Sequence, residues 1–565
     1  MTLRLFAPLA AALALAVPVG ASAQSAPPLD PRTAQTDLPL ELPRAAMELP
    51  HVALAFDVDP DSRSISGRGV YRVELTEAVD SLAFDLDPRF AVDAVSVDYD
   101  GSETALASDA WANVKGQLRI RLPQGMEAGD TAEVTIEWSG QPHIARNPPW
   151  DGGFTWSRAP GGEPWIATSV QGEGCDLFWP CLDHSSKRIG LLDMAVTVPS
   201  GLVAAGNGSL VRTTDNGDTS TYQWRARDPS TYGITLQIGP YELAERSYES
   251  RFGNTIPLMF WHLSGNAEEA DRLLAEMVTY LDFFEETIGP YPFADEKAGI
   301  AETPHLGMEH QTINAYGNEY KRDPLGYDWL LHHEFSHEWF ANQLTNETVN
   351  HMWLHEGIGT WMQPLYLGWL RGEMIYDAEM WRNRQMIQAR APLVTRDGSL
   401  QDYGDNRSGW GIDIYARGAW TMHALRYLVG DDVLFPALRR LTYGTDDPQP
   451  GEIRPVNRTT DDFRRILEEM SGRDLEWFFD TYFYEAELPR LRQWRENDTL
   501  WLEWQTTSSI AFEMPLEVRV GEDVVTVSMA GGRGRVDLPD YDTSYLVDPR
   551  NQVLMYDEAI VAARQ

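Results

Sequence analysis

The stretch HHEFSHEWFANQLTNETVNHMWLHEG, residues 332–357, contains a metal-binding pattern. Residues 333–337, HEFSH, fit the HExxH motif. Residues four apart lie on one face of a helix, so His333 and His337 are predicted to point two imidazoles at one ion. Glu334 lies beside the first ligand, where its carboxylate can reach a metal-bound water. The motif therefore predicts a hydrolytic metal site.

A third ligand is predicted in the same stretch. Glu356 follows His337 after eighteen intervening residues, a gap that suits a turn from one helix into an antiparallel neighbour. Two imidazoles and one carboxylate leave the fourth position of a tetrahedral ion open, as in catalytic zinc sites. We therefore predict one Zn²⁺ per chain, bound by His333, His337 and Glu356, although this donor set also accepts cobalt or manganese.

The remaining histidines and acids of the stretch are expected to have other roles. His332 is out of register, because the residue four positions later is a serine. His351 and His355 are expected at a helix start or behind the ligands rather than on the metal. Glu338 and Glu347 are expected to face solvent. A purely structural zinc site would not need a spare carboxylate beside its ligand, so hydrolysis of a peptide or amide bond is favoured.

Hydrophobic patterning divides the chain into three regions. Residues 46–248 contain short alternating stretches such as AEVTIEW, separated by turn residues, which predicts an all-β domain. Residues 249–487 are mostly helical in pattern, with a strand and loops over 297–318. Alternation then returns and predicts a small β-sandwich over 488–565. The predicted helices cover 266–289, 325–343, 355–371, 373–392, 415–429, 432–441 and 459–483.

The amino terminus predicts export. MTLRLFAPLAAALALAVPVGASAQS has one arginine before an apolar run and then Ala-Ser-Ala, so residues 1–23 are predicted to be a secretory signal peptide and 24–45 a linker. No later segment approaches the length needed to span a bilayer. The protein is therefore expected to be periplasmic or secreted. A disulfide between Cys175 and Cys181 would suit such a location, but their spacing alone leaves it open.

Composition narrows the class of protein. The chain has 565 residues, of which 43% are hydrophobic, as expected for a globular protein of several domains. Its net charge of −39 argues against nucleic acid as a partner, because the phosphates would be repelled. The acidic excess favours solubility and does not specify a substrate. Composition therefore points to a globular protein with no nucleic-acid partner.

Four stretches together resemble the gluzincin aminopeptidases, the family typified by aminopeptidase N and the leukotriene hydrolases. HEFSHEWFANQLT followed by WLHEGIGTW is similar to the zinc helices of that family. LGMEHQT (306–312) resembles its GxMEN exopeptidase motif, and YARGAW (415–420) resembles its Tyr-x-Lys-Gly motif. QGEGCDLFWPCLDH (171–184) resembles its Gln/Glu-bearing loop and Phe-Pro-Cys-x-Asp motif. The order and spacing of these stretches agree with the family over residues 45–490.

The resemblance implies a fold and a set of roles. The expected fold is multidomain α+β, with an N-terminal β-sheet domain, a thermolysin-like, mostly helical catalytic domain and a small C-terminal β-sandwich. Glu309 matches the glutamate that binds the free α-amino group of the substrate, with Gly307 and Met308 beside it in the substrate-binding motif. Gln171 matches the residue that lines the substrate pocket and helps to hold the amine. Tyr415 matches the tyrosine that donates a hydrogen bond to the oxyanion.

The sequence departs from the family at several positions. Leu306 replaces the first glycine of GxMEN and His310 replaces its asparagine, so both are expected to reshape the pocket for the first side chain. Arg417 replaces a lysine and keeps its charge, and His355 replaces the asparagine before the third ligand. The chain also ends in a β-module in place of a long helical domain. These departures affect specificity more than reaction class.

The resulting prediction is a zinc-dependent aminopeptidase that hydrolyses N-terminal residues from peptides, with Glu334 as general base and peptides with a free N-terminus as partners. One alternative is a metalloendopeptidase, which would have no use for an amine anchor at Glu309. Another is a catalytically silent binding protein, against which the intact Glu334, Glu356 and Tyr415 argue. The sequence leaves the preferred N-terminal residue and the oligomeric state open.

Overall fold

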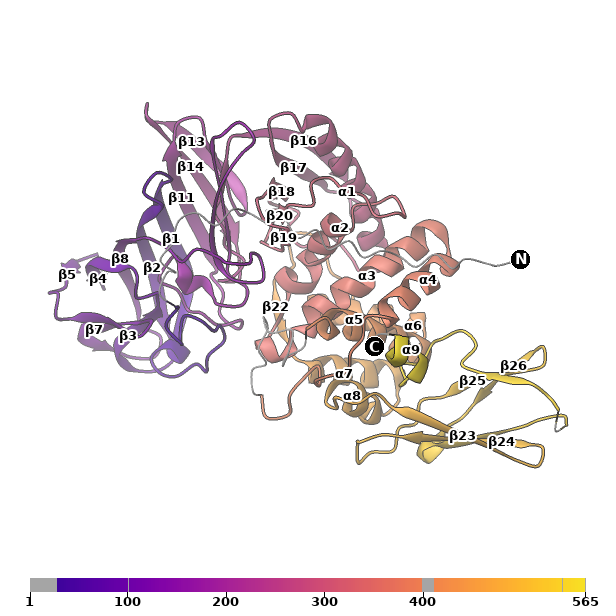
Figure 1. Ribbon diagram of the computed structural model, residues 1–565. Helices are drawn as coiled ribbons and strands as arrows, with labels where there is room; N and C mark the ends of the chain where they lie inside the picture. Colours follow the sequence, from indigo (N-terminus) through magenta and orange to yellow (C-terminus); the bar gives the residue numbers. More distant parts are fainter. Residues whose placement is uncertain (1–27, 100, 399–410, 541, 564–565) are drawn as a thin grey trace, which may run out of the picture.

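The computed structural model describes residues 28–563 except 100, 399–410 and 541. Figure 1 shows a β-sheet region, a mostly helical region and a C-terminal β-module, following one another along the chain. This architecture confirms the multidomain α+β fold. The predicted signal peptide, residues 1–23, lies outside the described residues. Within the described part of the chain, every helix is too short or too polar to cross a membrane.

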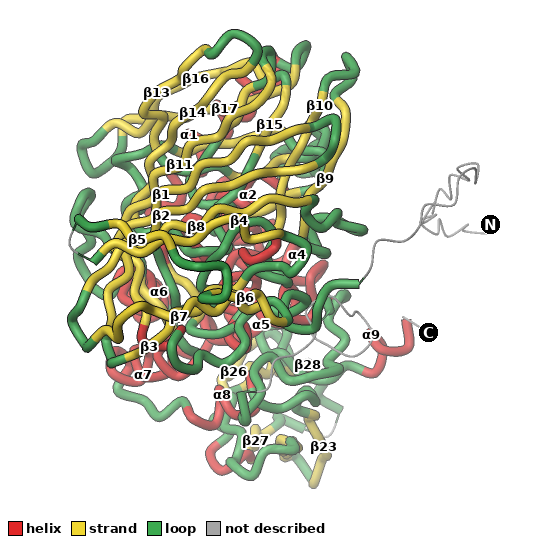
Figure 2. The backbone as a smooth tube through the Cα atoms, turned by 90° about the vertical axis from the view of Figure 1, so that its left-hand side faces the viewer, coloured by secondary structure: helices red, strands yellow, loops and turns green. Residues whose placement is uncertain are grey.

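The N-terminal region is built on one large sheet, whose strands lie side by side in Figure 2. Its strands bury alternate side chains, so one face covers a hydrophobic core. β1 (Met47–Asp59) runs parallel to β11 (Leu191–Pro199) and antiparallel to β2 (Ser64–Leu75). In spatial order the strands are β13 (Ser209–Asp215), β14 (Thr219–Arg227), β11 (Leu191–Pro199), β1 (Met47–Asp59), β2 (Ser64–Leu75), β8 (Thr131–Gly140), β4 (Ala91–Asp98) and β5 (Glu103–Ala105).

Two smaller sheets complete this region. The first contains β3 (Val79–Asp85), β7 (Gln117–Met126) and β6 (Trp111–Val114). The second contains β12 (Val203–Ala205), β15 (Gln237–Gly239), β10 (Pro164–Ser169) and β9 (Gly153–Arg158). β10 ends two residues before Gln171, so this sheet supports the loop that carries a predicted substrate-binding residue. Cys175 and Cys181, in the same loop region, form a disulfide.

A five-stranded sheet begins the region that the sequence predicts to be catalytic. Its order is β16 (Tyr241–Glu249), β17 (Thr255–Leu263), β18 (Ala298–Glu302), β20 (Asn314–Tyr316) and β19 (Gly307–Met308). β16 pairs with β17 along its whole length, so the predicted domain boundary at residue 248 falls inside this sheet. β19 lies at the edge of the sheet and leads directly into Glu309.

The helices follow the predicted pattern but differ from it at their ends. The predicted helix 325–343 begins only at Trp329, because the Asp328 side chain accepts a hydrogen bond from Leu331 N and caps it. It ends at Ser336, and a wider π-type turn follows over 338–343. The predicted helix 459–483 is two helices, separated at Gly472, whose φ is +66°. The helices are α1 (Ala267–Thr287), α2 (Trp329–Ser336), α3 (Trp353–Arg371), α4 (Glu373–Arg384), α5 (Asp413–Val429), α6 (Asp431–Tyr443), α7 (Thr460–Ser471), α8 (Glu476–Phe483) and α9 (Glu558–Ala563).

The C-terminal module contains two three-stranded sheets. They are β23 (Arg490–Glu496), β24 (Thr499–Gln505) and β27 (Arg533–Asp537), and β26 (Asp523–Val527), β25 (Leu516–Val520) and β28 (Tyr545–Val547). Their buried side chains, such as Leu502 and Val518, belong to the same hydrophobic cluster as the helices. The module therefore shares a continuous core with the catalytic region. A short parallel pair, β21 (Leu344–Asn346) and β22 (Val456–Arg458), joins the zinc-motif segment to the chain before α7.

Candidate active site

Helix α2 carries the two predicted imidazole ligands. His333 and His337 lie one turn apart, and their Nε2 atoms are 3.2 Å from each other. The Nδ1 atom of His337 lies 3.0 Å from the carbonyl oxygen of Phe340. A proton on Nδ1 donated to that carbonyl leaves the Nε2 lone pair free to bind a metal, which is the usual way in which a protein orients a histidine ligand.

The third predicted ligand comes from the next helix. Glu356, in the first turn of α3, places Oε2 at 3.4 Å from His333 Nε2 and 3.5 Å from His337 Nε2. A tetrahedral ion with bonds of about 2.0–2.1 Å separates its ligand atoms by about 3.3–3.4 Å. The three donor atoms therefore have the mutual spacing of three corners of a zinc tetrahedron. Their chemistry and their spacing both fit Zn²⁺.

Four glycines leave space around this site. A Cβ atom at Gly357 would lie 2.9 Å from the Cα of Gly418, so α3 and α5 cross where neither has a side chain. A Cβ at Gly359 would lie 3.0 Å from His337 Cε1. A Cβ at Gly307 would lie 2.4 Å from Glu334 Oε1. Glycine at these positions thus leaves room for His337, for Glu334 and for the helix that carries Tyr415.

The predicted amine-binding residues meet beside the metal donors. Gln171 Nε2 donates to Glu309 Oε1 at 2.6 Å and lies 3.5 Å from Glu356 Oε1. Glu309 is 3% exposed, and its burial raises its pKa to about 7. Tyr232, which the sequence did not single out, donates its hydroxyl to Glu309 Oε1 at 3.4 Å. A carboxylate held in this way can pair with a substrate ammonium next to the metal.

Glu334 lines a cavity of about 520 Å³ together with the predicted ligands. Burial, and then the charge of Glu309, raise the pKa of Glu334 well above its usual range. A cation bound between His333, His337 and Glu356 opposes this shift, because nearby positive charge favours the carboxylate. The other predicted site residues on the cavity wall are Gln171, Gly307, Met308, Glu309 and Tyr415.

Tyr415 is half-buried in the first turn of α5, with its ring centroid 6.1 Å from that of His333. This position places a phenol on the same cavity wall as the metal donors. Arg417, two residues later, is fully buried and donates to four backbone carbonyls, those of Ala391, Tyr482, Glu485 and Ala486. The charge at position 417 therefore stabilises the fold around α5 and does not line the cavity.

Two expectations about neighbouring residues are wrong. Glu338 does not face solvent: it is fully buried and accepts hydrogen bonds from Thr312 N at 2.9 Å and Asn314 Nδ2 at 2.7 Å. The wider turn after Ser336 rotates it inward. Asn342 Nδ2 donates both to Glu338 Oε2 and to the backbone oxygen of Glu309, at 3.2 and 3.0 Å. Glu338 is thus linked through Asn342 to the backbone of Glu309.

His310 is also placed differently from its expected role. It does not line the cavity, whereas Leu306 does. Its Nδ1 lies 3.4 Å from Gln237 Nε2, so it contacts the sheet of the N-terminal region. His355 does lie behind the ligands, as expected: its Nε2 accepts a hydrogen bond from Asn346 N at 3.0 Å. Of the two departures in the exopeptidase motif, only Leu306 therefore reshapes the cavity.

The loop that carries Gln171 also contains an acid that should make stability depend on pH. Glu173 Oε2 accepts a hydrogen bond from Gly152 N at 2.7 Å, and burial raises the pKa of Glu173 to about 7. A raised carboxyl pKa stabilises the fold fully below the ordinary value of 4.5, and this contribution is lost as the pH rises through 7. The variant Glu173→Gln cannot titrate but can still accept from Gly152 N.

We therefore expect Glu173→Gln to become more stable relative to wild type between pH 4.5 and pH 8, by at most about 3 kcal/mol. Urea unfolding at the two pH values measures this difference in the free energy of unfolding. The exposed Glu163→Gln is the matched control and should show no such change. A Glu173→Gln difference that stays constant across this pH range would contradict the expected titration.

Comparison with known proteins agrees with the fold and site. Residues 307–482 match the peptidase family M1 domain. Aminopeptidase M1-B of Oryza sativa subsp. japonica is 24% identical over 344 residues, which are 55% of this chain and 36% of that protein. Aminopeptidase N of Streptomyces lividans is 25% identical over 293 residues, 48% of this chain and 32% of that protein. The chain spans about half or less of the length of these curated relatives.

Solved structures show the same fold. A mutant M1 zinc metallopeptidase from Deinococcus radiodurans, bound to a Tyr-Ser-Ala substrate, superposes with a TM-score of 0.66 at 22% identity. The match covers 81% of this chain and 98% of that one. A two-domain M1 zinc metallopeptidase bound to L-tryptophan gives the same TM-score, identity and coverage.

The donor set, two histidines from HExxH and a glutamate from the next helix, is that of a gluzincin zinc site. More particularly, the chain contains a domain of the M1 family, to which the gluzincin aminopeptidases belong, and its cofactor is Zn²⁺.

Removing the metal should lower the stability of the fold. Glu309, Glu334 and Glu356 share a buried site, and a bound cation offsets their mutual repulsion. Zinc at 100 times its Kd stabilises the protein by about 2.7 kcal/mol. Dialysis against a chelator should therefore lower Tm, and zinc should restore it. Magnesium should not, because it prefers octahedral oxygen sites. An unchanged Tm after complete metal removal would contradict this stabilisation.

Proposed function

We propose that this protein is an exported zinc aminopeptidase that removes residues one at a time from the amino end of peptides. One observation carries the proposal: the Glu309 carboxylate, which accepts a hydrogen bond from Gln171, lies beside Glu334 and the metal donor His337 in the same cavity. An anchor for an ammonium at this place would fix the first peptide bond next to the metal.

The chain's own groups supply the steps of hydrolysis. Glu309 binds the substrate ammonium and aligns the first carbonyl. Glu334 takes a proton from the attacking water and passes it to the leaving amine. The Tyr415 hydroxyl donates a hydrogen bond to the oxyanion of the tetrahedral species. Zinc, when bound, polarises the carbonyl and lowers the pKa of the water.

Digestion of a defined peptide tests the proposal. A six-residue peptide with a free amino end should shorten from that end one residue at a time, as followed by mass spectrometry over time. The Glu334→Gln variant, which keeps the donor set, should leave the peptide intact. Internal fragments that appear before any N-terminal loss would overturn the proposal and favour the metalloendopeptidase. Tight peptide binding without any cleavage in the zinc-loaded wild type would favour the silent binding protein.

Export is the second part of the proposal. The amino-terminal sequence supports it, and the Cys175–Cys181 disulfide suits an oxidising compartment. Expression of the full gene product in a bacterial host, followed by fractionation, tests it. The mature protein is expected outside the cytoplasm, with Gln24 as its first residue in N-terminal sequencing. A protein that stays in the cytoplasm with its first 23 residues attached would contradict export.

A further inference from the structure

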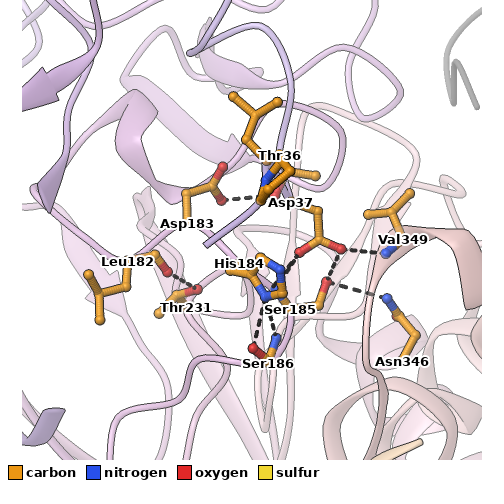
Figure 3. Close-up of polar contacts among 12 residues, drawn as sticks. Thr36, Asp37, Leu182, Asp183, His184, Ser185, Ser186, Thr231, Asn346 and Val349 are labelled. Carbon is orange, nitrogen blue, oxygen red and sulfur yellow. Dashed lines mark hydrogen bonds and ion pairs between the residues drawn. The ribbon is translucent and has the colours of Figure 1, made fainter. Parts of the chain in front are cut away.

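A segment near the amino terminus, residues 28–46, connects the N-terminal region to the catalytic region. We call it the strap. The sequence predicts a linker over most of this range, yet the strap is firmly packed: Thr33, Asp37 and Arg44 are 0%, 3% and 2% exposed. Arg44 pairs with the buried Asp85 at 2.6 Å. Figure 3 shows how Thr36 and Asp37 face residues from both regions.

The Asp37 carboxylate joins the two regions directly. Oδ1 accepts a hydrogen bond from Ser185 N at 2.5 Å, and Oδ2 accepts one from Ser185 Oγ at 3.0 Å. Oδ2 also accepts a hydrogen bond from Val349 N, in the catalytic region. Asn346 Nδ2, from β21, donates to Ser185 Oγ at 3.3 Å. Both carboxylate oxygens therefore contact Ser185 in the N-terminal region, and Oδ2 also contacts Val349 on the other side of the boundary (Figure 3).

The hydrogen bonds of the strap reach two segments that carry predicted site residues. Thr36 N donates to the backbone oxygen of Gly172 at 3.2 Å, next to Gln171. On the other side, Val349 opens the short turn that leads into α3 and Glu356. Thr36 Oγ1 also donates to Asp183 Oδ1 at 2.9 Å. The strap thus touches both the loop that binds the substrate amine and the approach to the third metal ligand.

Little empty space separates the strap from Gln171. The cavity between them has a volume of about 10 Å³, and its wall includes Thr36, Ser185, Gln171 and Tyr232. A cavity of this size holds at most about one water molecule. Because Thr36 N is also hydrogen-bonded to Gly172, a displacement of the strap would be passed to the Gln171 loop.

We propose that Thr36 and Asp37 form a positioning clasp that sets the place of Gln171 relative to Glu309 and Glu356. The inference rests on the proposed aminopeptidase function. Thr36 and Asp37 act on substrate binding only through the position of Gln171. The clasp does not touch α2 or α5, which carry Glu334 and Tyr415. Its loss should therefore weaken binding of the substrate amine more than it slows the chemical step.

The test compares Asp37→Asn and the milder Thr36→Val with Asp30→Asn in the full chain. Asp30 is the matched control, because its side chain accepts only from Arg32 N, inside the strap. For a substrate with a free amino end, Asp37→Asn should raise KM about tenfold while kcat changes less than about threefold. Zinc content should stay at one per chain. Hydrogen exchange of residues 171–174 should become faster in Asp37→Asn and stay unchanged in Asp30→Asn.

Two outcomes would contradict the proposed role of Thr36 and Asp37. One is an unchanged KM in both clasp variants. Another is a loss of zinc and of folded protein in both, which would reveal a purely structural role. If Asp37→Asn fails to fold, the KM of Thr36→Val decides. If the wild type shows no aminopeptidase activity, the proposed function fails by itself, and faster exchange confined to residues 171–174 would still support the clasp.

Discussion

The Glu334→Gln variant should hydrolyse peptides about 10²–10⁴-fold more slowly than wild type, with a KM close to that of wild type. Glutamine has nearly the same size and keeps the cavity wall intact, but it cannot accept the proton of the attacking water. The ligands His333, His337 and Glu356 remain, so zinc should still bind. The loss should therefore fall on kcat alone, which steady-state kinetics with the zinc-loaded variant would show.

The same stretch offers a matched control for this variant. Glu347 is exposed and lies outside the cavity, so Glu347→Gln should keep wild-type kinetics. Zinc content measured on both variants separates a lost proton acceptor from a lost metal. Hydrolysis by zinc-loaded Glu334→Gln at the wild-type rate would remove Glu334 from the mechanism.

The second large effect is expected at the amine anchor. Glu309→Gln would leave the substrate ammonium buried without its carboxylate partner, which costs about 3–5 kcal/mol. We therefore expect this variant to lower kcat/KM about 10²–10³-fold. KM should rise because the substrate ammonium loses its carboxylate. The kcat should also fall, because a substrate that is not anchored is poorly aligned with Glu334.

Gln171→Ala provides a graded comparison for the anchor. Its amide touches Glu309 Oε1 but carries no charge, so its removal should cost less than Glu309→Gln in kcat/KM. Unchanged kinetics in Glu309→Gln would show that the carboxylate does not bind the substrate, and the aminopeptidase proposal would lose its main support.

The metal donors could be predicted from the sequence because their placement is largely local. Helical periodicity brings His333 and His337 to one face, and the gap of eighteen residues allows Glu356 to return over them. The structure brings all three donor atoms together. The helical pattern gives a wrong prediction for the next residue, Glu338, because the helix opens into a wider turn there. No residue in the stretch indicates this turn.

Contacts between distant segments could not be predicted from pattern. Gln171 and Glu309 are 138 positions apart, and Asp37 and Val349 are 312 apart. The resemblance to the gluzincins supplied roles for Gln171 and Glu309, but nothing suggested Asp37. In the sequence, Asp37 lies in a stretch predicted to be a linker, and only the fold shows that it is buried. The strand β16 shows the same limit, because its partner β17 lies beyond the predicted boundary.

The reason for two glycines in α3 could not be predicted from the sequence. Gly357 and Gly359 lie inside α3, where glycine is unfavourable by about 1 kcal/mol relative to alanine. Their reason becomes visible only in the fold, where Gly357 meets Gly418 and Gly359 meets the ring of His337. Glycine at these positions lets a neighbouring helix or side chain lie close to the backbone of α3.

The central claim is that the protein recognises a free amino end. The most direct test is the ratio of kcat/KM for an aminoacyl fluorogenic substrate with a free amine to that for its N-acetylated form, measured with the zinc-loaded wild type. Acetylation removes the ammonium that Glu309 is proposed to bind, so we expect a ratio of about 10² or more. A ratio near one would contradict the claim.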